Sequence, residues 1–224
     1  MPPAIPPKGQ SGQEDPDTTT RFGGWLFRHR TSIPLPIVLA LVIIPPPRSS
    51  APLSTPLMLA GVLVAAAGEL LRFAGVHHIG VISRTRSERL GPLIDTGPFA
   101  HVRNPLYLGN ILLWLGFAIS ARLLWLAPIV VVLLALEYHA IVRWEEQLLE
   151  SRMGEPYRDY KTRVPRWIPR ITPAPSAVAV SPADQASPAA FTWVETLHSE
   201  RGTLITIVAG YLLLWAKTMV ENGL

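Results

Sequence analysis

The sequence predicts an all-α, multi-pass transmembrane protein, and both its composition and the grouping of its apolar residues support this fold class. Of the 224 residues, 49% are hydrophobic and 16% are charged, and the mean hydropathy is +0.28. Ordinary soluble domains carry about 25% charged residues. The apolar residues also occur in runs that approach the roughly 20 residues of a bilayer-spanning helix. We therefore expect about five transmembrane helices.

The absence of cysteine and the modest positive charge narrow the functional classes. A chain without cysteine has no disulfides, thiolate catalysis or zinc-thiolate site. The net charge of +4 comes from basic residues beside the apolar runs, where they set topology and contact anionic headgroups. No groove-reading motif accompanies them, so we do not expect nucleic-acid binding. The adjacent His77 and His78 diverge on a helix or strand, and we expect no metal site.

The expected organisation is a tail, a membrane domain, a linker and a final helix. Residues 1–20 are polar and Pro-rich and should be disordered. The membrane domain spans 21–170, a Pro/Ala/Ser linker spans 171–190, and an interfacial segment with an extra transmembrane helix spans 191–224. The expected spans are 33–44, 56–76, 106–119, 123–141 and 202–219. The first is too short for a full span, so it borrows flanking residues, inserts halfway or is a cleaved signal peptide.

Basic residues predict the orientation of these spans. The connection at 77–105 and the segment at 143–170 are rich in arginine, whereas the loops at the opposite ends carry only Arg48 and Arg122. By the positive-inside rule, both basic segments and the N-terminus face the cytoplasm.

The first of these connections ends in a turn that could hold a ligand. Pro98 and Pro105 disfavour helix at the residues before them. Gly97 and Gly109 leave room for close approach of a backbone or a ligand. Arg103 offers a planar donor suited to a carboxylate or phosphate, although an arginine here could equally set topology or bind a headgroup.

The second basic segment contains two adjacent carboxylates. Glu145 and Glu146 would point about 100° apart on a helix, so they cannot serve one small site equally. One could accept hydrogen bonds from a ligand ammonium or ribose while the other pairs with Arg143 or Arg103; a solvated helix face is the simpler interpretation of the pair alone.

A third polar feature lies near the end of the second span. Glu69 and Arg72 are three residues apart and share a helix face. They form either a structural ion pair or part of a polar site at membrane depth.

Three motifs in order give the clearest functional indication. Gly-Pro-Phe-Ala-His-Val-Arg-Asn-Pro-Leu-Tyr-Leu-Gly at 97–109 precedes an apolar hairpin, Arg-Trp-Glu-Glu at 143–146 and Val-Pro-Arg-Trp-Ile-Pro at 164–169. Over roughly residues 90–170, this arrangement resembles the isoprenylcysteine carboxyl methyltransferase and phospholipid methyltransferase family.

The resemblance implies an S-adenosylmethionine-dependent methyltransferase whose cofactor lies at the cytoplasmic edge of the helices, beside a lipid-accessible tunnel. The implied acceptor is a lipid or a prenylated, isoprenylcysteine carboxylate-like molecule in the bilayer. The implied cofactor-binding residues are Gly97, His101, Arg103, Asn104, Tyr107, Gly109, Glu145 and Glu146. The implied catalytic residues are Arg103, Glu146 and Arg166, with Arg166 and Trp167 closing the site over the charged end of the acceptor.

One position departs from the family pattern. Asn104 stands where the family usually has histidine, and asparagine cannot titrate. His101, three residues earlier, could take that role. This departure leaves a non-catalytic membrane scaffold as an alternative, and the similar Arg-His-Pro-x-Tyr turn of NADPH-dependent membrane sterol and enone reductases is a second one.

Overall fold

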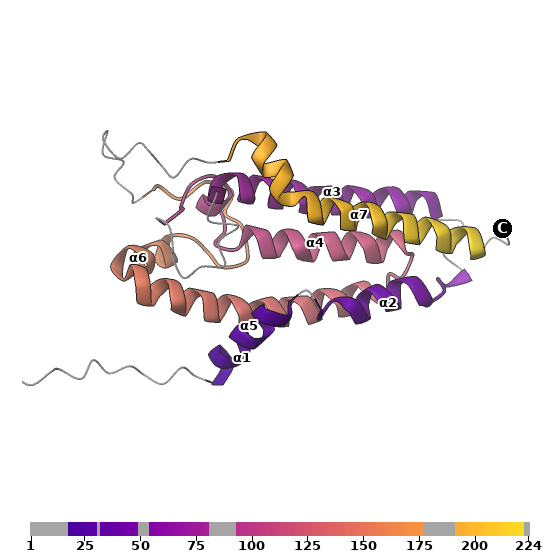
Figure 1. The fold of residues 1–224 in the computed structure, drawn as a ribbon, viewed down its shortest axis with the longest axis horizontal. Coiled ribbons are helices and arrows are strands. Elements are labelled where there is room, and N and C mark those ends of the chain that lie inside the picture. Colours follow the sequence, from indigo (N-terminus) through magenta and orange to yellow (C-terminus); the bar gives the residue numbers. More distant parts are fainter. Residues whose placement is uncertain (1–17, 31, 49–53, 81–92, 177–190, 222–224) are drawn as a thin grey trace, which may run out of the picture.

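The protein is an elongated bundle of helices (Figure 1). The structure, a computed structural model, describes residues 18–30, 32–48, 54–80, 93–176 and 191–221. The helices are α1 Thr18–His29, α2 Leu35–Ile43, α3 Ser54–Ile79, α4 Pro105–Ser120, α5 Ala127–Met153, α6 Glu155–Arg163 and α7 Trp193–Glu221, with a short 3₁₀ helix, η3, at Gly97–Ala100. The described residues contain no strand, which confirms the all-α fold class. The start of α1 overlaps the last three residues of the predicted tail; 1–17 and 177–190 lie outside the described residues.

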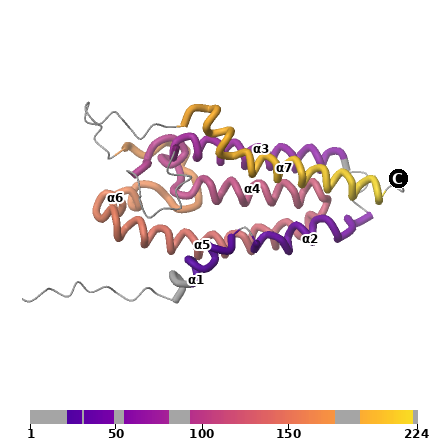
Figure 2. Tube along the Cα trace, in the orientation of Figure 1, coloured from indigo at the N-terminus to yellow at the C-terminus, as the bar shows by residue number. Residues whose placement is uncertain are grey.

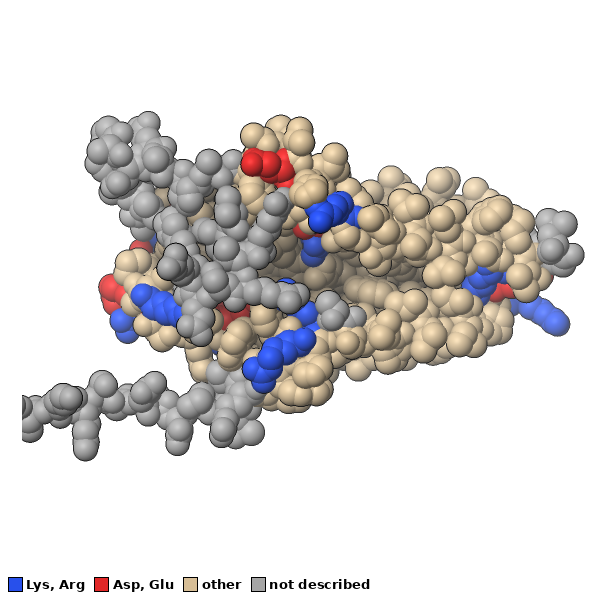
Figure 3. Space-filling model, viewed as in Figure 1, with Lys and Arg blue, Asp and Glu red and all other residues tan. Residues whose placement is uncertain are grey.

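Among the residues that the structure describes, three helices are long and apolar enough to cross a membrane: α3 over Thr55–Ile79, α5 over Ala127–Met153 and α7 over Trp193–Glu221. The 16-residue α4 and the nine-residue α2 span about 24 and 14 Å, less than the roughly 30 Å of a hydrocarbon core. On the face drawn in Figure 3, Lys, Arg, Asp and Glu are spread over the half of the molecule that contains α6 and gather again at the opposite end, with an uncharged stretch between. Five spans therefore remain a prediction, of which three have helices of sufficient length.

Small residues bring α3 and α4 into close contact. A Cβ added at Gly68 would lie 2.6 Å from the Gly109 carbonyl oxygen, and one added at Gly116 would lie 2.5 Å from the Gly61 carbonyl oxygen and 2.6 Å from the Ala65 amide nitrogen. These glycines recur every seven residues, or about two helical turns, on both helices. The backbones approach closely there, as small residues allow between membrane helices.

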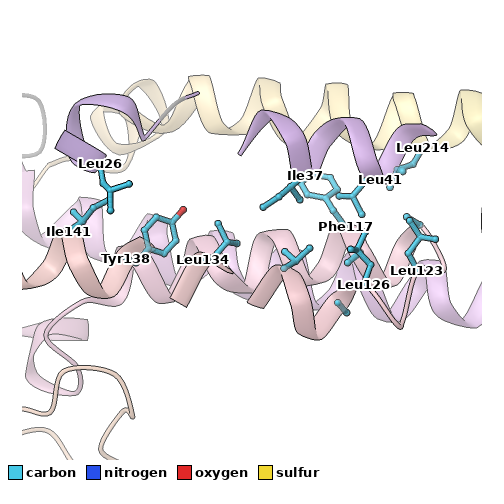
Figure 4. Packing of buried hydrophobic residues seen from close by; sticks show 14 of the residues in the cluster. Leu26, Ile37, Leu41, Phe117, Leu123, Leu126, Leu134, Tyr138, Ile141 and Leu214 are labelled. Carbon is cyan, nitrogen blue, oxygen red and sulfur yellow. The ribbon is translucent and has the colours of Figure 1, made fainter. Parts of the chain in front are cut away.

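The larger apolar cluster lies between α5 and the two N-terminal helices (Figure 4). Leu134 and Ile141 of α5 are buried there with Leu26 of α1 and Ile37 of α2. The middle of α1 packs closely on α5, because a Cβ at Gly24 would lie 3.0 Å from Trp144 Nε1. This packing holds α1 over the half of α5 that carries the glutamates.

The polar end of the bundle contains η3, α6 and the non-helical segment that follows α6 (Figure 2). Gly154, with φ of 62°, ends α5 and starts α6. This backbone conformation is one that glycine adopts without the steric cost of a Cβ. A smaller cluster of Tyr157, Tyr160, Val164 and Ala174 is buried here. The continuous α5 runs past residue 141, the expected end of the fourth span, so both glutamates lie on its last turns.

Candidate active site

The backbones of two segments that are distant in sequence pair at the polar end. The Arg103 amide donates to the Pro165 carbonyl at 2.9 Å, and the Arg170 amide donates to the His101 carbonyl at 3.0 Å. The Ala174 amide donates to the Ala100 carbonyl at 2.9 Å. The turn before α4 and the segment after α6 thus form one unit, facing the end of α5.

Glu146 is held by two arginines, one from each segment. Arg166 donates from Nε to Oε1 at 3.1 Å and from Nη2 to Oε2 at 2.6 Å. Arg103 Nη1 lies 2.9 Å from Oε1, and its side chain is only 11% exposed. The hydrogen bonds to Glu146 raise the pKa of Arg166 above its usual value, so Arg166 stays cationic. The sequence predicts that one of the two adjacent glutamates pairs with Arg143 or Arg103. In the structure Glu146 pairs with Arg103.

Glu145 has a different partner. The Tyr107 hydroxyl donates to Glu145 Oε1 at 2.8 Å. The Tyr107 ring packs against Tyr138 with ring centroids 4.9 Å apart. The two adjacent carboxylates thus face different groups, as their separation around the helix predicts.

Asn104 and His101 bind the backbone of the opposite segment. Asn104 Nδ2 donates to the Arg166 carbonyl at 3.2 Å, and His101 Nδ1 lies 2.7 Å from the Arg170 carbonyl oxygen. A protonated Nδ1 would donate this bond. Trp167 Nε1 donates to His139 Nδ1 at 3.4 Å. In this arrangement Asn104 acts as a hydrogen-bond donor. An amide can fill this role without the titratable ring of a histidine.

Gly97 and Gly109, where the sequence predicts close approach of a backbone or a ligand, each lie against other protein groups. The Gly97 backbone, with φ of 57°, lies against the imidazole of His78, so a Cβ would clash with that ring. A Cβ at Gly109 would lie 2.6 Å from both Arg72 Cγ and the Gly68 carbonyl oxygen. The absence of a side chain is needed at both positions for packing within the protein.

The sequence alone did not identify the role of the buried tyrosines behind the turn. The Tyr160 hydroxyl donates to the Phe99 carbonyl of η3 at 2.9 Å. Burial raises the pKa of both Tyr160 and Tyr157 well above the usual value near 10, so these phenols stay neutral. Nearby, Asp95 accepts a hydrogen bond from Ser176 at 2.8 Å and lies 3.6 Å from Arg163 Nη2.

The arrangement suits a small ligand that carries both charges. Arg103 Nε is buried and makes no hydrogen bond, which leaves a donor for a ligand carboxylate. Glu145, bound through a neutral hydroxyl, can accept from a ligand cation. Glu146 is occupied by the two arginines and holds them in place.

Residues 57–155 match the phospholipid methyltransferase family. The chain contains a phospholipid methyltransferase domain. The domain begins in α3 and ends at the first residue of α6, so it includes Arg103, Tyr107 and both glutamates. Arg166 and the whole of α7 lie beyond it. The family supports a membrane methyltransferase, and its presence with three apolar helices fits an integral membrane protein.

Three curated proteins show partial similarity. The chain is 35% identical over 80 residues to the nickel-cobalt-cadmium resistance protein NccN of Alcaligenes xylosoxydans xylosoxydans, covering 36% of this chain and 37% of the relative. It is 32% identical over 80 residues to the cobalt-zinc-cadmium resistance protein CzcN of Cupriavidus metallidurans, with the same coverage. An uncharacterized protein of Haemophilus influenzae is 38% identical over 63 residues, which are 28% of this chain and 79% of that protein. The matches to the two resistance proteins thus span little more than a third of their length, and no solved structure matches significantly.

Proposed function

We propose that this protein uses S-adenosylmethionine to methylate a lipid or prenylated acceptor at the cytoplasmic face of the membrane. The observation that carries the proposal is the different pairing of the adjacent carboxylates on α5. Glu146 binds Arg103 and Arg166, while Glu145 accepts a hydrogen bond from the neutral Tyr107 hydroxyl. A zwitterionic, sulfonium-bearing cofactor needs both an arginine and an available carboxylate.

The residues of the site fit this cofactor. Arg103 would bind its carboxylate through the buried Nε, which has no hydrogen-bond acceptor of its own. Glu145 would accept from its ammonium group. S-adenosylmethionine supplies a methyl group already activated by the sulfonium. The protein then has to align the acceptor and exclude water, without a covalent nucleophile.

The acceptor would approach from the bilayer. Arg166, 30% exposed and fixed by Glu146, would meet an anionic end of the acceptor, with Trp167 beside it. A carboxylate acceptor needs no general base. An amine would first have to lose a proton, and Glu145 would be the candidate base. The positive-inside rule places this end of the bundle in the cytoplasm, where S-adenosylmethionine is available.

We propose no metal site for this protein. Among the residues that the structure describes, no group of three or more His, Cys, Asp or Glu could hold a metal ion.

Cofactor binding tests the proposal directly. S-adenosylmethionine is titrated by calorimetry into detergent-purified wild type, Arg103→Ala and Glu146→Ala, with thermal unfolding as a check of folding. Glu146→Ala leaves two arginines without their carboxylate partner, which disturbs the site beyond the loss of one contact. Glu145→Gln is therefore added as a second variant, because glutamine has nearly the same size and shape as glutamate. Arg158→Ala is the control, since Arg158 belongs to an exposed pair with Glu155 on α6.

We expect saturable binding by wild type and the control, and at least tenfold weaker binding by folded site variants. Folded wild type that does not bind S-adenosylmethionine would overturn the proposal. Binding of NADPH instead would indicate a reductase, and binding of neither would indicate a scaffold.

A further inference from the structure

The last helix, α7, lies outside the methyltransferase domain but is docked against α3, the first helix of that domain (Figure 1). The Trp193 ring stacks on His77 with centroids 3.9 Å apart. Thr196 Oγ1 lies 3.3 Å from His77 Nδ1, and the Phe191 amide donates to the His77 carbonyl at 3.1 Å. These contacts fix the start of α7 at the polar end of the bundle.

One turn further along α7, a single arginine joins three helices. Arg72 of α3 donates from Nη2 to Glu200 Oε2 at 2.6 Å and to Thr203 Oγ1 at 3.1 Å, both on α7. Its Nη1 donates to Asn110 Oδ1 of α4 at 2.5 Å. The stem of Arg72 crosses α4 at Gly109, where no side chain stands in its way. The guanidinium therefore links α7 to the helix that begins at the candidate active site.

Two glutamates lie beside this arginine, but they are not equivalent. Glu200 is 5% exposed and accepts the short hydrogen bond. Glu69, three residues before Arg72 on the same helix, lies 3.5 Å from Arg72 Nε, and neither of its carboxylate oxygens accepts a hydrogen bond. The expected ion pair between Glu69 and Arg72 is present, and Glu200 adds the shorter contact, which orients the guanidinium.

Asn110 connects the arginine to the active site. It lies three residues after Tyr107, about 4.5 Å along α4 and on the same face. The Asn110 side chain lies near the Tyr138 hydroxyl, and the Tyr138 ring packs against Tyr107. Neighbouring groups therefore lead from Glu200 through Arg72, Asn110 and Tyr138 to Tyr107, the tyrosine that binds Glu145.

We propose that α7 is part of the methyl-transfer site, with Glu200 as a positioning residue that acts through Arg72 and Asn110 to hold Tyr107 against Glu145. The proposal rests on the function proposed above for Glu145. It gives the helix outside the family domain a defined role. It also explains why a charged pair is retained between apolar helices, where burying unpaired charge is costly.

The test compares the same glutamate-to-glutamine substitution at the two glutamates beside Arg72. Glu200→Gln removes the charge that accepts the short hydrogen bond from Arg72, and Glu69→Gln removes the charge that pairs with the arginine at 3.5 Å without a hydrogen bond. The full-length variants in detergent are compared by amide hydrogen exchange of α4 and by calorimetric affinity for S-adenosylmethionine. Glu200→Asp, which keeps the charge on a shorter side chain, covers the possibility that Glu200→Gln does not fold.

We expect Glu200→Gln to bind the cofactor at least fivefold more weakly and to exchange faster at residues 107–112. Glu69→Gln should match wild type in both measurements, and Glu200→Asp should fall between them. The proposal is overturned if folded Glu200→Gln keeps wild-type exchange in α4, or if it keeps wild-type affinity despite faster exchange. If wild type binds no cofactor, the proposed function fails, and the exchange of α4 alone decides whether Glu200 holds this helix.

Discussion

Arg166 binds Glu146 through two hydrogen bonds, one to each carboxylate oxygen, at 3.1 and 2.6 Å. The two residues lie on α5 and on the segment after α6, 20 positions apart. Arg103 reaches the same carboxylate from the turn before α4. Glu146 thus connects three segments of the candidate active site. Substitution of its arginine partners tests whether these contacts matter for binding.

Replacing Arg166 by lysine should weaken cofactor binding while leaving the positive charge in place. Lysine offers a point charge that cannot reproduce the planar, two-bond contact. Hydrogen bonds to charged groups contribute about 1.5–3 kcal/mol each. Loss of one loosens Glu146, which also holds Arg103, so we expect a several-fold fall in the affinity for the cofactor. Calorimetric titration of Arg166→Lys with S-adenosylmethionine measures this change. Arg158→Lys, at the exposed pair on α6, should bind like wild type, and equal affinity of both variants would argue against the bidentate contact.

Tyr107→Phe should affect cofactor binding more than stability. The substitution removes the hydroxyl that donates to Glu145 but keeps the ring that packs on Tyr138. Glu145 then loses the hydroxyl that donates to it. An unsatisfied buried carboxylate costs about 1–3 kcal/mol, in the cofactor-free or the cofactor-bound state. We expect a several-fold rise in the KM for S-adenosylmethionine and a small fall in the unfolding temperature, both measured in detergent. A large loss of stability with unchanged KM would mean that the hydroxyl serves folding alone.

The seam between α3 and α4 should tolerate no added methyl group. In Gly116→Ala the new Cβ would meet the Gly61 carbonyl oxygen at 2.5 Å and the Ala65 amide nitrogen at 2.6 Å. Both are backbone atoms, so the helices would have to separate, which costs about 1–3 kcal/mol. A clearly lower thermal unfolding temperature is the expected result.

Gly202→Ala is the matched control for this seam. Nothing lies within 4 Å of the position a Cβ would take at Gly202 on α7. Alanine is favoured over glycine in helices by about 0.5–1 kcal/mol, so this variant should unfold at the same or a higher temperature. If both variants lost stability equally, close approach at the seam would not be the cause.

The helical architecture was predictable because apolar runs and prolines act locally. The prolines at 45–47 follow α2, and the apolar runs predicted the positions of α3, α4, α5 and α7. The separation of Glu145 and Glu146 around a helix predicted that they would have different partners. The choice between Arg103 and Arg143 for one of them depends on how α4 and α5 face each other, which helical periodicity does not encode.

Contacts between distant helices were beyond local prediction. Arg72 and Glu200 are 128 positions apart, and neither sequence neighbourhood indicates the other. Glu69, at a spacing typical of a helix pair, was the more obvious partner. Tertiary packing placed α7 close enough for Glu200 to bind the arginine as well, at a shorter distance. The same limit applies to Gly97 and Gly109, whose contacts lie on α3.

Stability should fall at alkaline pH because of the tyrosines at the polar end. The folded state holds the Tyr160 phenol protonated, since burial raises its pKa and the hydroxyl donates to the Phe99 carbonyl. Below pH 10, tyrosine in both states keeps its proton, so this group gives no pH dependence. Above the ordinary pKa of about 10, the unfolded state loses the proton first and the stabilisation is progressively lost. The unfolding temperature measured from pH 8 to about pH 11.5 should therefore decline beyond that ordinary pKa.

Tyr160→Phe separates this titration from other alkaline effects. The variant loses one hydrogen bond and should be less stable at neutral pH by about 1 kcal/mol. It has no phenol to ionise at this position, so its unfolding temperature should fall less steeply than that of wild type above pH 10. Tyr157 keeps its own raised pKa in the variant, and some decline should remain. Curves that stay parallel across this pH range would show that the alkaline loss arises elsewhere.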